Sequence, residues 1–450
     1  MKRQTWSSQL TYILAVAGAT IGFGCTWRFP YLVGENGGGA YVLIFCLAMI
    51  VIGIPMILVE NVIGRRYQKN AVDAFGAGPW KIVGYMGLIG AFGIMSYYMV
   101  IGGWVLEYIY NILTSKLDLS SGEITKELST QVYADSIDNS PFKVILMTFL
   151  FVLINYIILK KGAVKGIENA AKVLMPLLFL LMIIMVIRNL TLDDAMKGVE
   201  FYLIPDFTKI NTKLFIDVLG QVFFALSLGF GVMITMSSYL DKKTNLVKIS
   251  VITGVLNTFI AVLAGFMIFP SLFSFGLEPA SGPSLVFKTL PLVFSKIFLG
   301  NIIAILFFLL LMLAALTTSL PIYEVIITVI CEKSKMSRNS AIILTLGVIF
   351  VLGNIPSALS SNILSDVTIF GKSIFDAFDS ISATIFFIMT SLFCAIYVGW
   401  VMRDDAKQEL KFGFDGSNKI VEIWYFYVKF IIPFVILAVF VSSFYDNFLK

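Results

Sequence analysis

The stretch GATIGFG at residues 18–24 lies in the middle of the first hydrophobic segment of the chain. Three glycines within seven residues disfavour a continuous helix at this place. A second stretch, SLGFG at residues 227–231, repeats the Gly-Phe-Gly pattern near the middle of the sequence. Backbone groups that leave a helix inside a bilayer need new partners, because each unsatisfied group costs several kcal/mol there. Two interrupted segments, one in each half, therefore predict a site for a solute and an ion near the bilayer midplane.

The composition indicates an all-α integral membrane protein. Hydrophobic residues make up 58% of the chain, charged residues make up 14%, and the mean hydropathy is +0.90. Apolar runs recur that can cross ~30 Å of hydrocarbon, alone or with their flanking residues, and they predict about 11 transmembrane helices. These runs lie at residues 4–27, 36–59, 82–106, 144–159, 173–187, 218–240, 249–277, 297–323, 339–365, 380–402 and 430–445.

Lysine and arginine are unevenly distributed between the two sides of the predicted bundle. If the N-terminus is cytoplasmic, the cytoplasmic segments hold 20 of the 33 lysine and arginine residues, as the positive-inside rule requires. We therefore predict a multi-pass protein of the plasma (inner) membrane with a cytoplasmic N-terminus and, after an odd number of spans, a C-terminus outside. The net charge of +5 reflects this topology. We expect the lipid bilayer as a partner, no nucleic acid and no obligate protein partner.

The side chains that enzymes use most often are scarce. The chain has no histidine, which is the commonest general base and metal ligand. Its four cysteines, at positions 25, 46, 331 and 394, lie in or beside predicted spans without the spacing of a metal site. A catalytic site needs a nucleophile with a base, or a metal cluster. We therefore expect that the protein is not an enzyme.

Several longer strings resemble the neurotransmitter:sodium symporter family, in its bacterial amino-acid transporter branch. They are WRFP at 27–30, ENGGGA at 35–40, GIP at 53–55, GR at 64–65 and GQVFF at 220–224. The resemblance covers nearly the whole chain and implies one transporter domain, 1–450, with the leucine-transporter fold. Spans 1–5 (1–190) and spans 6–10 (210–403) would form a five-plus-five inverted-topology repeat with discontinuous helices 1 and 6. Span 11 (420–450) would be an extra C-terminal helix.

The resemblance implies two sodium sites. The ligands of the second site map to three carbonyls and two hydroxyls, a set that suits a hard monovalent cation. They belong to Gly18, Ile21, Ala314, Thr317 and Thr318. Threonines in a helix can instead bond back to their own helix, and this alternative stays open here.

The first sodium site departs from the family pattern. Its positions are Thr20, Cys25, Ala225 and Asn257. Cys25 replaces an asparagine and Ala225 replaces a threonine, so two of the side-chain oxygens are missing, and sulfur suits sodium poorly. We expect this site to be weak, remodelled or empty, which leaves one sodium ion per substrate.

The resemblance also allows chloride coupling to be judged. Chloride-dependent relatives bind the anion at positions that correspond to Phe45, Gln221, Ala225 and Ala261. Only Gln221 among these offers a polar side chain, whereas a desolvated anion needs several donors. We therefore expect no chloride dependence.

The substrate positions implied by the resemblance are uncharged. They are Ala19, Thr20, Phe23, Gly24, Ile94, Tyr98, Phe224, Ala225, Ser227, Phe230, Thr318 and Ile322. A charged substrate side chain would be stranded among them, so a neutral amino acid with an apolar or aromatic side chain fits best. Gly22 stands where monoamine carriers place an aspartate, so the substrate is expected to bring its own carboxylate. That carboxylate would meet the N–H groups of the interrupted first helix and the Tyr98 hydroxyl.

Charged residues at both ends of the predicted spans resemble the gates of this family. Arg28 and Asp379 correspond to the outer gate. The inner latch corresponds to Arg3, Glu332, Trp6 and Tyr239. Glu60 resembles the glutamate that bonds the unwound part of span 6. These features predict sodium-coupled symport by alternating access. Two alternatives remain. One is proton coupling through Glu60, alone or with sodium, and the other is a non-transporting sensor of the same fold.

Overall fold

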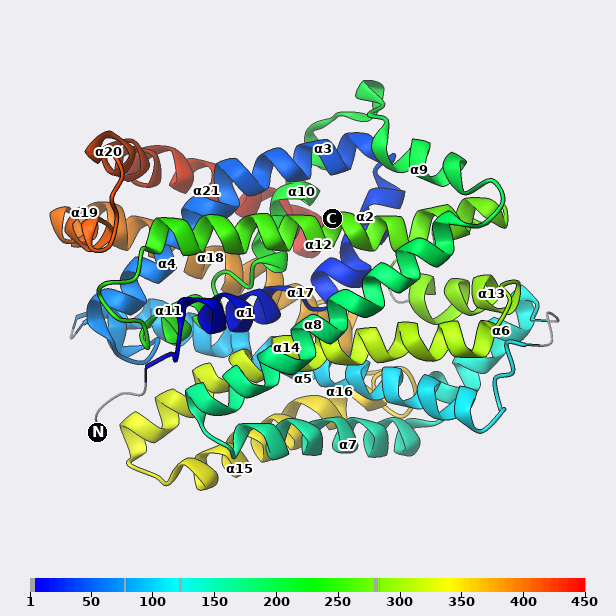
Figure 1. Ribbon diagram of the computed structural model, residues 1–450. Helices are drawn as coiled ribbons and strands as arrows, with labels where there is room; N and C mark the ends of the chain where they lie inside the picture. Colours follow the sequence, from blue (N-terminus) through cyan, green and yellow to red (C-terminus); the bar gives the residue numbers. More distant parts are fainter. Residues whose placement is uncertain (1–4, 77, 121–123, 279–281, 283, 450) are drawn as a thin grey trace.

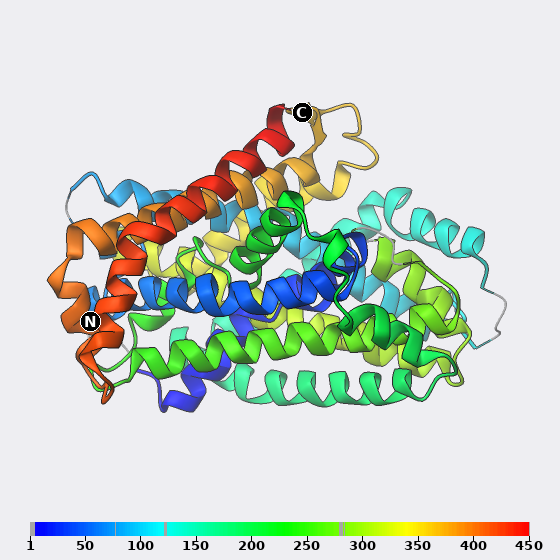
Figure 2. The same ribbon diagram turned by 90° about the horizontal axis from the view of Figure 1, so that it is seen from above.

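The computed structural model describes residues 5–76, 78–120, 124–278, 282 and 284–449. Long helices run side by side along one direction and form an elongated bundle (Figure 1). In Figure 1 the α19–α20 connection lies at one end of this bundle, and α6 and α13 lie at the other end. In Figure 2 the same bundle is seen from above.

Among the described residues, nine helical segments are long and apolar enough to cross a membrane. They are α3–α4 (Gly39–Tyr67), α5 (Lys81–Leu113), α7 (Pro141–Leu159), α8 (Ala163–Leu190), α12 (Leu246–Ser274), α14 (Gly300–Ser334), α15–α16 (Arg338–Leu359), α17–α18 (Ile374–Met402) and α20–α21 (Asn418–Leu449). The bent pair formed by α1 (Gln9–Thr20) and Gly24–Glu35, whose last part is α2 (Phe29–Glu35), turns by 54°. The predicted all-α membrane fold is therefore confirmed.

The predicted sixth span is also interrupted. It consists of α10 (Thr212–Ala225) and α11 (Val232–Ser237), separated by residues 226–231. The total of eleven spans counts these two short helices as one span and, like the inverted repeat, stays a prediction.

The remaining elements are short and connect the long helices. They are α6 (Lys126–Tyr133), α9 (Ala195–Leu203), α13 (Leu290–Ser295), α19 (Asp404–Lys411) and an antiparallel pair of strands, β1 (Thr368–Ile369) and β2 (Lys372–Ser373). The separate helices within the four long composite spans are α3 (Gly39–Ala48), α4 (Ile54–Tyr67), α15 (Arg338–Ile349), α16 (Ile355–Leu359), α17 (Ile374–Ser380), α18 (Ile388–Ile396), α20 (Asn418–Phe426) and α21 (Ile432–Phe444).

Several observed helices are longer than the apolar runs that predicted them. The run at 173–187 corresponds to α8, which begins ten residues earlier at Ala163, and the run at 430–445 corresponds to a helix that begins at Asn418. The reason is that a helix can continue through charged residues, such as Glu168 and Lys172 in α8, where a hydropathy run stops. Conversely, the first break is narrower than predicted, because α1 remains helical through Gly18 and ends at Thr20.

The core lies around α5 and α14. In the most apolar part of α5, 83% is buried, and in that of α14, 72% is buried. The corresponding share for the α20–α21 segment is 22%. The helix α14 packs along α5 and α8, and α1 lies against α8, α12 and α14. This arrangement places the end of α1 among the central helices, where backbone that leaves the helix must find partners within the protein.

Candidate substrate and ion site

The first break receives side-chain donors from three different elements. The carbonyls of three consecutive residues at the end of α1 each accept a hydrogen bond of this kind. The pairs are Thr318 Oγ1 with Gly18 (2.9 Å), Ser227 Oγ with Ala19 (2.8 Å) and Asn257 Nδ2 with Thr20 (3.1 Å). A helix end leaves carbonyls without intrahelical partners, and here α14, the α10–α11 connection and α12 supply donors.

The second break depends on glycine and on Glu60. Ser227, Gly229 and Gly231 all have positive φ angles, of 51°, 82° and 76°. A Cβ atom at Gly229 would lie 2.2 Å from the backbone oxygen of Phe387, so only glycine fits there. The Gly229 N–H donates to Oε1 of the buried Glu60 at 2.7 Å. Glu60 therefore holds the unwound part of the chain at the position where the resemblance places it.

A small uncharged cavity lies between the two breaks. Its volume is about 10 Å³, and it is lined by Thr20, Gly22, Phe23, Gly24, Ile94, Tyr98, Phe224, Ser227, Phe230 and Thr318. All of these except Gly22 are among the predicted substrate residues. A cavity of this size holds about one water molecule, so a solute enters only when side chains move.

The three other predicted substrate residues lie close to this cavity without lining it. Ala19 and Ala225 reach the site through their carbonyls, which bond Ser227 and Asn257. Ile322 is buried on α14, four residues after Thr318.

Gly22 was singled out in the sequence for its missing side chain, and it lies at the centre of the site. A Cβ atom at this position would come within 2.4 Å of Thr318 Oγ1 and 2.5 Å of the Tyr98 hydroxyl. The Tyr98 hydroxyl itself accepts a hydrogen bond from the Phe23 N–H at 3.4 Å. There is no space here for an aspartate without a rearrangement of the surrounding side chains.

The residues predicted for the second sodium site come together at the junction of α1 and α14. Thr318 crosses the junction to the Gly18 carbonyl. Thr317 instead donates to the carbonyls of Leu313 (3.1 Å) and Ala314 (3.0 Å) in its own helix, which is the alternative noted for a lone threonine. Ile21 is buried in the break. Every candidate ligand here is an uncharged oxygen, and this chemistry fits a monovalent hard cation.

The residues predicted for the first sodium site also come together, but donors already point at its carbonyls. Asn257 Nδ2 lies 3.1 Å from the carbonyl oxygens of both Thr20 and Ala225. Cys25 Sγ lies 3.5 Å from the same Thr20 oxygen, and the Thr20 hydroxyl donates to Ala17 at 3.0 Å. This donor set does not fit a cation.

The positions examined for chloride offer little to an anion. Gln221 donates its amide Nε2 to the Gly24 carbonyl at 2.6 Å. Phe45 packs against the ring of Phe29, with centroids 4.6 Å apart, and Ala261 is buried. The single polar group of this set is thus engaged with the backbone of the segment that follows the first break.

A second cavity, of about 120 Å³, lies beside the residues of the predicted outer gate. Phe23, Tyr98 and Phe224 line both this cavity and the small one, so their rings separate the two. Arg28 and Asp379 lie on the walls of the outer cavity. In the described part of the chain they are not paired with each other, because the Arg28 guanidinium lies 4.4 Å from the Phe224 ring centroid and Asp379 accepts a hydrogen bond from Tyr97 (2.6 Å).

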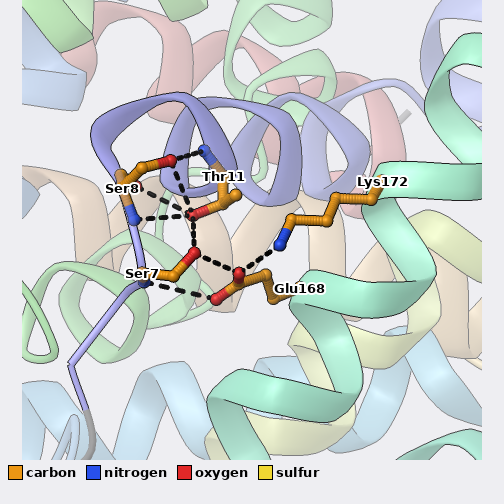
Figure 3. Close-up of polar contacts among 5 residues, drawn as sticks. All are labelled: Ser7, Ser8, Thr11, Glu168 and Lys172. Carbon is orange, nitrogen blue, oxygen red and sulfur yellow. Dashed lines mark hydrogen bonds and ion pairs between the residues drawn. The ribbon is translucent and has the colours of Figure 1, made fainter.

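The N-terminal segment is tied to the end of the bundle that we predict to be cytoplasmic, called the inner end below. Figure 3 shows Glu168 of α8 between Ser7 and Lys172: Ser7 bonds Glu168 through both its hydroxyl and its N–H, and Lys172 Nζ lies 2.6 Å from Glu168. Ser8 caps α1 through the Thr11 N–H. Trp6 of the predicted latch donates to the Met236 carbonyl at 3.0 Å. Arg3 lies outside the described residues.

Two further polar groups at the inner end were missed by sequence reasoning. Arg338 forms a two-pronged ion pair with the buried Glu324, with contacts of 2.9 and 2.7 Å. Glu324 also accepts a hydrogen bond from Thr328, which contacts the hydroxyl of the predicted latch residue Tyr239 at 3.3 Å. An acidic residue directly after the apolar run at 297–323 was the available signal for Glu324.

The other predicted latch residue, Glu332, contacts the loop that follows α4. Its carboxylate accepts a hydrogen bond from Asn70 Nδ2 at 2.7 Å, and Asn70 also bonds Asp73 at 2.8 Å. Burial raises the pKa of the Asp73 carboxyl, but hydrogen bonds from Asn70 and Lys81 outweigh burial and leave the pKa below its ordinary value. Asp73 is therefore ionised and completes a polar layer at the inner end.

A sequence profile of the Sodium:neurotransmitter symporter family matches residues 3–140 and 130–448. The chain belongs to this family. An uncharacterized sodium-dependent transporter of Haemophilus influenzae is 61% identical, with 98% of each chain covered. An uncharacterized sodium-dependent transporter of Bacillus subtilis is 36% identical, with 97% of each chain covered. The crystal structure of MhsT in complex with L-phenylalanine has a TM-score of 0.89 at 38% identity and covers 98% of this chain and 100% of MhsT.

These similarities confirm the predicted family and the predicted fold class. They also confirm that the protein is a sodium-dependent, multi-pass membrane transporter of a small-molecule substrate, and not an enzyme.

Proposed function

We propose that this transporter imports a neutral L-amino acid with an apolar or aromatic side chain, driven by sodium and independent of chloride. The observation that carries the proposal is the uncharged cavity between two helix breaks, lined by backbone, hydroxyl and aromatic groups. The bound L-phenylalanine of MhsT, a protein of the same fold, supports this substrate class. Transport would occur at the plasma membrane, with the N-terminus cytoplasmic and the C-terminus outside.

The two ends of an amino acid find complementary groups at the breaks. The N–H groups of Gly22 and Phe23 lie at the start of the second half of span 1, where the helix dipole favours a carboxylate. The Tyr98 hydroxyl lies beside the Phe23 N–H. The carbonyls of Ala19, Phe224 and Ala225 would accept hydrogen bonds from the ammonium group. The substrate side chain would displace the rings that now fill the site, because the closed cavity is too small for it.

The sodium ion would bind at the second sodium site, where α1 meets α14. The Gly18 and Thr318 oxygens now share a hydrogen bond across this junction, and both carry lone pairs that a cation can use. In alternating access, spans 1, 2, 6 and 7 form a bundle that rocks against the other spans. An ion that bridges the bundle and the rest of the protein has a different affinity for the two states, which is the requirement for coupling.

The gates support this cycle. The outer cavity reaches Arg28 and Asp379, which are not paired in the described structure. At the predicted inner end, Glu168, Glu324 and Glu332 form polar contacts with other segments. Pairing of Arg28 with Asp379 would close the outer cavity over a bound substrate. Ion pairs of this kind are weak enough to open again.

Uptake into proteoliposomes tests the proposal. A thermal-shift screen of the twenty amino acids in sodium and in potassium first identifies the ligand, because only a ligand of the folded state stabilises it. We expect stabilisation by apolar or aromatic amino acids that is larger in sodium. Uptake of that amino acid should then follow an imposed sodium gradient at symmetric pH and persist without chloride.

Two alternatives give different results in the same assay. Uptake that follows a pH gradient without sodium, and that Glu60→Gln abolishes, would indicate proton coupling instead. Binding without any uptake would indicate a sensor of the same fold.

A further inference from the structure

The contacts of Asn257 differ from those of a sodium ligand. Its amide nitrogen lies 3.1 Å from the Thr20 carbonyl at the end of α1 and 3.1 Å from the Ala225 carbonyl at the end of α10. Its carbonyl oxygen Oδ1 is buried and has no hydrogen-bond partner among the described residues. A sodium ligand would present this oxygen, and not the N–H groups, to the space between the two carbonyls.

The neighbouring side chains supply no replacement oxygen. Cys25 offers a thiol beside the Thr20 carbonyl, and Ala225 has no polar side-chain atom. The Thr20 hydroxyl donates to Ala17 in its own helix. The two carbonyls that face this space are therefore satisfied by an amide, and the other candidate ligands are a sulfur atom and a hydroxyl that is already engaged.

We propose that the Asn257 amide takes the place of a sodium ion at the first sodium site, so that this transporter couples one sodium ion to each substrate molecule. The proposal rests on the sodium-coupled function argued above. An amide NH₂ group carries two N–H donors that can point at two carbonyls at once. It therefore satisfies the carbonyls at the ends of the broken helices, as a bound cation would. It does so permanently, without exchange with the solution.

The location of Asn257 explains why this replacement is compatible with transport. Its contacts join α12 to the ends of α1 and α10, and all three elements belong to the bundle that rocks as one unit. An amide link inside the bundle stays intact in both states of the transporter. The second sodium site lies instead between the bundle and α14, so an ion there is sufficient for coupling.

The number of bound sodium ions tests the proposal directly. Purified transporter is titrated with ²²Na⁺ at equilibrium, with and without L-phenylalanine as a probe, and the saturating stoichiometry is measured. We expect one sodium ion per chain. Two ions per wild-type chain would overturn the proposal while leaving sodium-coupled transport intact, whereas absence of sodium binding would overturn the proposed function itself.

Variants assign the lost ion to this place. Cys25→Asn combined with Ala225→Thr restores the oxygens of the family pattern, which lets an ion compete with the Asn257 amide for the two carbonyls. Asn257→Asp removes the N–H donors and adds a negative charge. We expect each variant to raise the stoichiometry from one to two. A folded variant pair that stays at one ion would overturn the assignment.

Asn354 offers a matched control. Its Nδ2 also donates to two carbonyls, those of Met95 (2.8 Å) and Ser96 (2.7 Å) in α5, and its Oδ1 is also buried without a partner. Because these carbonyls lie within a continuous helix and not at a break, Asn354→Asp should leave the stoichiometry at one. A rise to two in this control would show that any buried aspartate recruits sodium, and would overturn the interpretation of Asn257→Asp.

Discussion

Replacement of Thr318 by valine is the sharpest test of the ion position. Valine has nearly the shape of threonine, so Thr318→Val removes the hydroxyl without opening a cavity. The hydroxyl is buried and lies 2.9 Å from the Gly18 carbonyl oxygen. The loss of a buried oxygen that contacts a cation costs about as much as the loss of a hydrogen bond to a charged group, about 1.5–3 kcal/mol, which corresponds to roughly a 10- to 150-fold change in an equilibrium constant. We expect the sodium concentration for half-maximal uptake to rise by a factor in this range.

The assay compares sodium titrations of uptake in proteoliposomes at saturating amino acid. Ser319→Ala is the matched control, because Ser319 is the next residue on α14 but bonds Asn155 of α7 at 2.6 Å, away from α1. This control should change the half-maximal sodium concentration less than about twofold, since it removes no ion ligand. Equal sodium dependence in Thr318→Val and wild type, or equal shifts in both variants, would refute the placement of the ion between α1 and α14.

Two more predictions concern the substrate and the stability of the fold. Tyr98→Phe removes a hydroxyl that contacts the Phe23 N–H, so the amino-acid concentration for half-maximal uptake should rise about tenfold. Sodium binding measured without substrate should stay near the wild-type value. A loss of sodium binding alone would contradict the role of Tyr98 in binding the carboxylate. Glu409→Ala removes the carboxylate that lies 2.7 Å from the fully buried Arg65, which then keeps only backbone carbonyls among the described residues as partners. A buried charge without a counter-charge costs about 3–5 kcal/mol. The thermal midpoint in detergent should therefore fall well below that of Asp405→Asn, whose half-exposed carboxylate contributes only about 0–1 kcal/mol.

The membrane fold and the two breaks could be predicted because both depend on local composition. A glycine cluster inside an apolar run has few other interpretations at membrane depth, and the structure interrupts span 1 after Thr20 and span 6 after Ala225. Helix ends were less predictable, because α8 continues through Lys165, Glu168 and Lys172 into a region that hydropathy alone assigns to a loop.

The direction of individual hydrogen bonds could not be predicted. Thr317 and Thr318 are adjacent and chemically identical, yet one donates within α14 and the other crosses to α1, because successive residues on a helix point about 100° apart. The same holds for Asn257, whose residue type suits a sodium ligand as well as a donor; only the arrangement of Thr20 and Ala225 around it distinguishes the two. Residue identity therefore predicts which side chains gather at the breaks, and geometry decides the direction of their hydrogen bonds.

The polar contacts at the breaks divide into two kinds, and this division bears on how an ion can drive transport. Glu60 with Gly229, Ser227 with Ala19 and Asn257 with Thr20 each join elements of the bundle that we propose to rock. In the proposed cycle these contacts would persist and would favour neither state. The Thr318 bond to Gly18 instead joins that bundle to α14, so it would break when α1 moves away. A sodium ion at that junction would add its binding free energy to one state only, and such a difference in affinity shifts the equilibrium between states.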